Sequence, residues 1–374
     1  MKFTKITLTI VATLFLTSCA GFFNKDNAPK PAPLTSFKAT LTPHHVWITT
    51  LKTPVGFSFN ENTLFVASER GAITALNPGD GHVVWSSKIH ATPTTAPGVG
   101  NGLVVVGCDH GTVAALHQMD GTPAWRTTVT GQILAKPLIA QNRVIIKTTN
   151  GGLYVLEATA GKQQWSLKQN EPDLILRGAS TPLVKSNALF VGFANGHLAK
   201  INLQSGMVYW ERPIAIPEGG FAIDRMIDID ANPTTTDYHL FAVTYQGNLA
   251  ALDEETGRLS WSHPLSSYTG MAIRKEAVYI SDAEGHLLAF NIQDGAIIWQ
   301  QDSLLSRHLT APVIMGNFLV VGDGLGYLHW FNLKDGQLAA REFVGSAIVA
   351  APVVEQNTLY ALTTEGKLVA YRIT

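Results

Sequence analysis

Charged residues and cysteines are scarce in this chain of 374 residues, and each scarcity excludes a class of protein. Lys, Arg, Asp and Glu make up only 15% of the chain, and the formal net charge is −1. Without a basic excess the chain cannot neutralise a phosphate backbone, which argues against nucleic-acid binding. Of the two cysteines, modification of Cys19 would leave Cys108 without a disulfide partner. Apolar residues reach 46%, so a large core can be buried.

Common catalytic motifs are absent as well. The chain has no His-Glu-x-x-His, Cys-x-x-Cys, Gly-x-Ser-x-Gly or P-loop pattern. The run from Gly322 to Gly326 contains three glycines, but it joins two β segments and does not enter a helix, which predicts a hairpin turn. Cys108 ends an apolar run and is interpreted as a buried structural thiol. These observations predict a protein that is not an enzyme and has no metal site.

The N-terminus has the form of a bacterial lipoprotein signal. Lys2 and Lys5 precede an apolar run from Ile6 to Leu16, which is shorter than the ~20 residues that a membrane-spanning helix needs. Leu16-Thr-Ser-Cys19 is typical of a lipobox, so residues 1–18 are predicted to be a cleaved signal and Cys19 to carry fatty acyl chains, which would anchor the protein stably. A chance cysteine near an ordinary cleavage site is the alternative. Ala20, where inner-membrane lipoproteins often have Asp, favours the outer membrane, with the protein facing the periplasm.

Residues 19–40 are rich in proline and polar groups and show no apolar periodicity. They are predicted to form an extended tether. Residues 41–374 are predicted to form one folded domain.

A repeat of about 42 residues organises that domain. A glycine is followed ten residues later by a second glycine, and in six of seven units a tryptophan stands four residues further on. The seventh unit has Ala340 at the tryptophan position. The first glycines are Gly71, Gly111, Gly151, Gly196, Gly247, Gly285 and Gly326, and the tryptophans are Trp85, Trp125, Trp165, Trp210, Trp261 and Trp299.

Each unit contains short β-rich runs separated by Gly and Asp turns, which indicates antiparallel hairpins. A further strand is expected after an X-Pro step in every unit except the one near Gly270. Four strands per repeat predict a β-propeller blade. The eighth unit stops at Thr374 before its second glycine and tryptophan, and His45-Val-Trp47-Ile supplies the missing strand. The prediction is an all-β, eight-bladed propeller of four-stranded antiparallel blades, closed by its N-terminal strand.

The repeat carries a resemblance to known families. The pattern from Gly247 to Trp261 resembles the tryptophan-docking repeat of quinoprotein dehydrogenases, called the PQQ-like repeat. Together with the lipobox and the chain length, it resembles the BamB family, the propeller lipoproteins of the outer-membrane β-barrel assembly (BAM) machinery. A pyrroloquinoline quinone dehydrogenase is the competing interpretation. Those enzymes usually hold the quinone against a Cys-Cys disulfide, which this chain lacks, so no cofactor is expected.

Two consecutive connections between repeats are unusually long, and loops on a rigid scaffold often carry function. One contains Leu174, Leu176 and Arg177, and the other contains Asp228 and Asp230. Apolar anchors beside an arginine and carboxylates are typical of an interface hot spot, although the same residues could be core and loop caps.

The resemblance implies that these five residues meet the periplasmic POTRA domains of BamA. Arg177 would donate hydrogen bonds, Leu174 and Leu176 would be anchors, and Asp228 and Asp230 would accept. Arg177 could instead pair with Asp228 or Asp230 within the chain. The function implied is a non-catalytic scaffold that assists β-barrel insertion, with other BAM lipoproteins as indirect partners and unfolded outer-membrane proteins as substrates at a blade edge. A scaffold for another envelope complex is a further alternative.

Overall fold

The computed structural model describes residues 29–172, 174–176, 180–348 and 350–373. The chain divides into two units, Met1–Pro31 and Ala32–Thr374, and all strands of the described residues belong to the second. One 3-10 turn, η1 (Asp109–Gly111), interrupts the β structure. Within the described ranges, no helix has the length and apolar character needed to cross a membrane.

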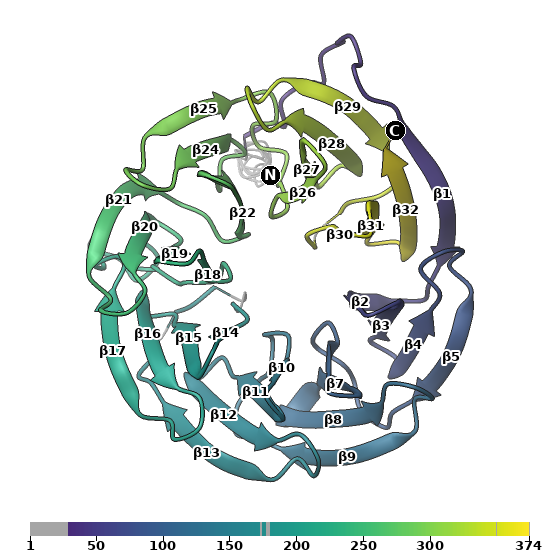
Figure 1. The fold of residues 1–374 in the computed structure, drawn as a ribbon, viewed down its shortest axis with the longest axis vertical. Helices are drawn as coiled ribbons and strands as arrows, with labels where there is room; N and C mark the ends of the chain where they lie inside the picture. The colour runs from purple at the N-terminus through teal and green to yellow at the C-terminus, as the bar shows by residue number, and fades with distance from the viewer. Residues whose placement is uncertain (1–28, 173, 177–179, 349, 374) are drawn as a thin grey trace, which may run out of the picture. The chain divides into compact units, whose positions relative to one another are not determined.

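The second unit is a ring of eight four-stranded antiparallel sheets, which confirms the predicted propeller (Figure 1). In each blade the first strand lies nearest the centre of the ring and the fourth lies at the rim (Figure 1). The strand bounds of blades 1 to 4 are β2 (Pro54–Asn60), β3 (Thr63–Ser68), β4 (Ala72–Leu76) and β5 (Val83–Lys88); β6 (Gly98–Gly100), β7 (Leu103–Gly107), β8 (Thr112–His117) and β9 (Pro123–Thr128); β10 (Leu138–Ala140), β11 (Arg143–Lys147), β12 (Gly152–Glu157) and β13 (Gln163–Lys168); and β14 (Leu183–Lys185), β15 (Ala188–Gly192), β16 (His197–Asn202) and β17 (Val208–Pro213).

Blades 5 to 8 follow the same order. Their strands are β18 (Thr234–Thr235), β19 (His239–Val243), β20 (Gly247–Asp253) and β21 (Leu259–Leu265); β22 (Met271–Arg274), β23 (Ala277–Ser281), β24 (Leu287–Asn291) and β25 (Ile297–Gln301); β26 (Val313–Met315), β27 (Phe318–Gly322), β28 (Tyr327–Asn332) and β29 (Leu338–Phe343); and β30 (Val353–Glu355), β31 (Thr358–Leu362), β32 (Lys367–Ile373) and β1 (Pro43–Thr50).

Blade 8 joins the two ends of the domain. β1 pairs antiparallel with β32, and Trp47 lies opposite Ala370 in the register. The last blade therefore takes its rim strand from the N-terminal end of the domain, as the missing glycine and tryptophan predicted. This pairing gives blade 8 its fourth strand and holds both ends of the domain in one sheet.

The glycine and tryptophan pattern is explained by contacts between neighbouring blades. The Nε1 of Trp85 in blade 1 donates to the carbonyl of Gln118 in blade 2 at 3.1 Å. A Cβ on Gly121 would lie 2.5 Å from Cε3 of Trp85, so only glycine lets the ring approach. The same contact recurs around the ring from Trp47, Trp125, Trp165, Trp210, Trp261 and Trp299. Ala340 lacks a partner of this kind because blade 8 has no turn between its third and fourth strands.

The hydrophobic core lies between the blades. Val105 and Ala115 of blade 2, for example, pack with Val144 and Leu156 of blade 3, and all four are almost fully buried. The second and third strands of each blade contribute most of these side chains, while the rim strands are more exposed, as β9 and β13 show.

The antiparallel order gives the ring two distinct faces. The turns between first and second strands, and between third and fourth strands, emerge on one face, which we call the turn face. The other face carries the connections from the fourth strand of each blade to the first, innermost strand of the next blade. We call it the connection face. Most of these connections end at a proline just before or at the new strand, whereas the short connection 266–270, which enters β22, contains none.

Residues 32–40, which belong to the predicted extended tether, lie along blade 7. The amide of Thr40 donates to the carbonyl of Ala339 at 3.0 Å. Arg307 and Arg341 donate through their guanidinium groups to the carbonyls of Ala32 and Thr35. The proline content of this segment does not reveal that two arginines of the propeller bind its backbone.

Candidate partner-binding site

The two longest connections lie next to each other on the connection face. Residues 169–182 link β13 to β14, and residues 214–233 link β17 to β18. The amide of Leu176 in the first connection donates to Oδ1 of Asp228 in the second at 3.0 Å. The amide of Thr181 donates to Oδ1 of Asn232 at 2.7 Å. Two loops far apart in sequence therefore form one surface.

Buried aliphatic side chains hold the second connection against blade 4. Ile227 and Ile229 are almost fully buried. Each packs where glycine leaves room, because a Cβ on Gly192 would lie 2.3 Å from Cγ2 of Ile229, and one on Gly196 would lie 2.5 Å from Cδ1 of Ile227. The alternation of Ile227, Asp228 and Ile229 thus anchors the loop and fixes the position of the carboxylate between them.

A buried lysine lies beneath this surface. Lys147, at the end of β11 in blade 3, donates to Oγ of Ser180 at 3.0 Å and to the carbonyl of Gly192. Its ammonium lies 6.0 Å from the ring centroid of Phe193. Lys147 of blade 3 therefore binds both the entry loop of blade 4, at Ser180, and the end of β15, at Gly192.

Lys147 interacts electrostatically with three carboxyl groups of the two connections. Burial lowers the pKa of Lys147, while Asp230, Glu171 and Asp228 oppose that effect. Burial, with a smaller contribution from Asp230, raises the pKa of Asp228 to about 7. Burial also raises the pKa of Asp230 to about 6, against the effect of Lys147, and it raises the pKa of Glu171. The cluster therefore carries less negative charge near neutral pH than three free carboxylates would.

Both connections also expose apolar side chains. The exposed fraction is 42% for Leu174 in the first connection, and 75% and 58% for Phe221 and Ile223 in the second. Exposed apolar side chains beside polar loops are a common property of protein interfaces.

The structure places the predicted site residues as follows. Leu174 is exposed, Leu176 is half-buried, and both belong to the surface described above. Asp228 is only 1% exposed and accepts from the Leu176 amide, so a direct hydrogen bond from a partner to Asp228 does not fit its burial. Asp230 is partly exposed. Arg177 and Cys19, the predicted lipidation site, lie outside the described residues.

Lys147, Phe221 and Ile216 are further residues of this region that the sequence pattern did not single out. The sequence did contain a signal for Lys147, which is a charged residue at a position that is small or apolar in the other repeats. This position lies four residues before the first glycine of each repeat. The other repeats have small or apolar residues at that position: Ala67, Gly107, Gly192, Val243, Ser281, Gly322 and Leu362. The exposure of Phe221 and Ile216, at 75% and 74%, had no comparable signal because this connection has no counterpart of its length in the other repeats.

The expected thiol and hairpin turn are confirmed. Cys108 is a free, fully buried cysteine, and burial raises its pKa to about 12. The run from Gly322 to Gly326 joins β27 and β28 directly. Over the described ranges, no group of three or more His, Cys, Asp or Glu residues is arranged to hold a metal ion.

Comparison with known proteins identifies the relatives of this chain. The family model for outer membrane protein assembly factor BamB matches residues 39–107 and 69–301. The chain is 41% identical to that factor from Pseudomonas aeruginosa over 97% of each chain, and 32% identical to that from Escherichia coli K12 over 98% of this chain and 97% of the relative.

Solved structures agree with this result. The crystal structure of BamB from Moraxella catarrhalis superposes with a TM-score of 0.83 at 27% identity, and covers 88% of this chain and 100% of its own. A europium-containing methanol dehydrogenase superposes with a TM-score of 0.70, but at 11% identity over 87% of this chain and 84% of its own it shares the fold alone. The chain therefore belongs to the BamB family of outer membrane protein assembly factors.

Proposed function

We propose that this chain is a non-catalytic lipoprotein of the BAM complex that binds the POTRA domains of BamA and assists the insertion of β-barrel proteins into the outer membrane. The observation that carries the proposal is the joined surface of residues 169–182 and 214–233, which presents exposed apolar side chains on a rigid ring. The name of the relatives, outer membrane protein assembly factor, supports a role in the assembly of outer-membrane proteins. Cys19 would hold the protein at the outer membrane.

The residues of the site divide into two roles under this proposal. Leu174 and Phe221 provide apolar contact area, and Arg177 donates hydrogen bonds to the partner. Asp228 acts indirectly, because its carboxyl group holds the Leu176 amide and so fixes the segment that carries Leu174. Lys147 supports both connections from below through Ser180 and the nearby carboxyl groups.

Binding of purified POTRA domains to surface variants tests this proposal. Leu174→Asp and Phe221→Asp replace exposed side chains, so they should weaken binding and leave the circular dichroism spectrum unchanged. Met119→Asp is a matched control, because Met119 is 90% exposed in the turn between β8 and β9 on the turn face. Arg177→Ala tests the predicted donor. If the connection-face variants bind as strongly as the wild type, the site assignment is wrong, and if the wild type does not bind, the proposed partner is wrong.

A further inference from the structure

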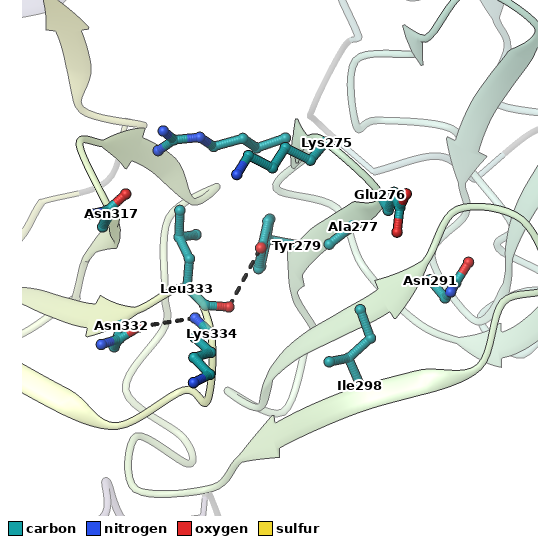
Figure 2. Close-up of a pocket in the computed structure, with 11 residues that line it drawn as sticks. Lys275, Glu276, Ala277, Tyr279, Asn291, Ile298, Asn317, Asn332, Leu333 and Lys334 are labelled. Carbon is teal, nitrogen blue, oxygen red and sulfur yellow. Dashed lines mark hydrogen bonds between the residues drawn. The ribbon is translucent and has the colours of Figure 1, made fainter.

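A groove on the turn face, between blades 6 and 7, is distinct from the partner-binding surface. It has a volume of about 1010 Å³ and is lined by the β22 to β23 turn, the β26 to β27 turn and the β28 to β29 turn. A ligand-binding pocket typically has ~300–1,000 Å³, so the groove can hold a short chain of residues. In Figure 2, Leu333 is seen between Lys275 and Lys334.

Three hydrogen-bond acceptors of the groove are occupied by the fold itself. The carbonyl of Leu333 accepts from Nε1 of Trp299 at 3.0 Å and from Oη of Tyr279 at 3.4 Å. The side-chain oxygens of Asn332 and Asn291 accept backbone amides of their own turns at 2.9 and 2.8 Å. These turn contacts direct the two amide NH2 groups away from the turn backbone, where they can donate.

The cations of the groove, by contrast, bind no carboxylate of the described chain, although Arg274 interacts electrostatically with Tyr279. The side chains of Arg274, Lys275 and Lys334 make no hydrogen bond or ion pair with any described residue, and Lys275 and Lys334 are exposed. Glu276 is the single carboxylate among the lining residues. The groove is therefore rich in donors and positive charge, and it complements a ligand rich in acceptors and negative charge.

The corresponding boundary between blades 4 and 5 shows what such a cation binds inside the fold. Lys185 stands eleven residues before the first glycine of its repeat, the position that Arg274 has in blade 6. The ammonium of Lys185 pairs with Oε2 of Glu254 at 2.5 Å. Leu333 stands at the position of Glu254 in blade 7, so Arg274 has no internal carboxylate.

A second position differs between the two boundaries in the same way. Glu255 in blade 5 pairs with Lys200, but blade 7 has Lys334 at the position of Glu255. Two carboxylates that close the boundary between blades 4 and 5 are therefore replaced by an apolar residue and a cation between blades 6 and 7. The exposed side chain of Ile298 and the partly buried Leu333 add an apolar surface that suits the aliphatic part of a glutamate side chain.

We propose that the groove between blades 6 and 7 binds an acidic peptide segment, whose carboxylates take the places that Glu254 and Glu255 have between blades 4 and 5. Because the groove is on the turn face, a protein bound to the connection face leaves it open. The chain can then hold two protein segments at once, one on each face of the ring.

Fluorescence anisotropy of a labelled, glutamate-rich peptide with the full folded domain tests this inference, and a glutamine version of the same peptide is the ligand control. Lys334→Glu should weaken binding of the glutamate peptide by about 5- to 10-fold, because it removes one exposed ion pair and adds one repulsion, each of which changes affinity by a few-fold. Lys162→Glu makes the same charge change at an exposed turn-face position of blade 3 and should leave binding unchanged. Binding should also weaken as salt rises.

Leu333→Glu tests the inference most directly, because it places a carboxylate in blade 7 at the position that Glu254 has in blade 5. It should pair with Arg274 and abolish peptide binding, with thermal unfolding measured to confirm the fold. Equal binding of the glutamate peptide to wild type, Lys334→Glu and Leu333→Glu would overturn the inference, as would equal binding of the glutamine peptide. Lys334-dependent binding of vesicles that contain phosphatidylglycerol, without peptide binding, would show a lipid ligand and also overturn it.

Discussion

Replacement of Asp228 by Asn should make the stability of the folded protein depend less on pH. The folded protein raises the pKa of Asp228 from the ordinary value of 3.8 to about 7, so between these values the folded state holds a proton that the unfolded chain has released. The free energy of unfolding must then fall as pH rises through this window. Above about pH 7 the contribution of the Asp228 proton is lost completely. The difference between the two pKa values corresponds to about 4 kcal/mol at most.

Asp228→Asn removes the ionisation and keeps an oxygen that can accept from the Leu176 amide. We expect the free energy of unfolding to rise by about 2–4 kcal/mol relative to wild type at pH 8, and to change little at pH 4. Asp228→Ala is the control for the hydrogen bond, because it leaves the Leu176 amide without this acceptor and should be about 1–3 kcal/mol less stable than Asp228→Asn.

Urea denaturation followed by tryptophan fluorescence at several pH values between 4 and 8 measures these differences. The m-values should agree between wild type and variants, so that changes in midpoint report stability. Parallel pH profiles for wild type and Asp228→Asn would show that Asp228 does not titrate in this window, and would refute the electrostatic description of the site.

Four further predictions concern other parts of the ring. Lys147→Met should lower the free energy of unfolding by about 3 kcal/mol at pH 8 and by less at pH 5, where the neighbouring carboxyl groups take up protons; an equal loss at both values would contradict the charge interaction. Gly121→Ala should destabilise the protein by at least about 2 kcal/mol more than Gly102→Ala, because both glycines have φ near +70° but only a Cβ at Gly121 meets a tryptophan ring; equal melting temperatures would argue against the docking contact. Arg341→Ala should make residues 32–40 more sensitive to protease, since it removes the donor to Thr35; unchanged cleavage rates would show that Arg341 does not hold the segment. The thiol of Cys108 should react with a thiol reagent only after unfolding, and rapid labelling of the native protein would contradict its burial.

The number and order of blades could be predicted from the sequence because each repeat uses the same contact. A tryptophan packs on the second glycine of the next blade, so both residue types recur at fixed spacing around the ring. The exception at Ala340 was informative as well, because it marks the boundary where the last blade is completed by β1. Local turn chemistry and a repeated interface were therefore sufficient for the fold.

The candidate site was only partly predictable because its geometry depends on contacts between different repeats. The length of two connections located the surface, but the spacing of Asp228 and Leu176 could not reveal that the carboxyl group is buried under the Leu176 amide. Lys147 lies on another blade altogether, and nothing in its local sequence relates it to Asp230. Contacts such as Leu176 with Asp228 and Lys147 with Asp230 form only when the folded ring places successive connections side by side, so local sequence does not predict them.

The affinity of purified BamA POTRA domains for this protein, measured by titration with wild type, Leu174→Asp, Phe221→Asp and Met119→Asp, tests the proposed function most directly. We expect saturable binding to wild type and Met119→Asp, with a loss of at least about tenfold for each connection-face variant, as expected for apolar hot-spot residues. Binding that is equal for all four proteins, or absent for the folded wild type, would contradict the proposal.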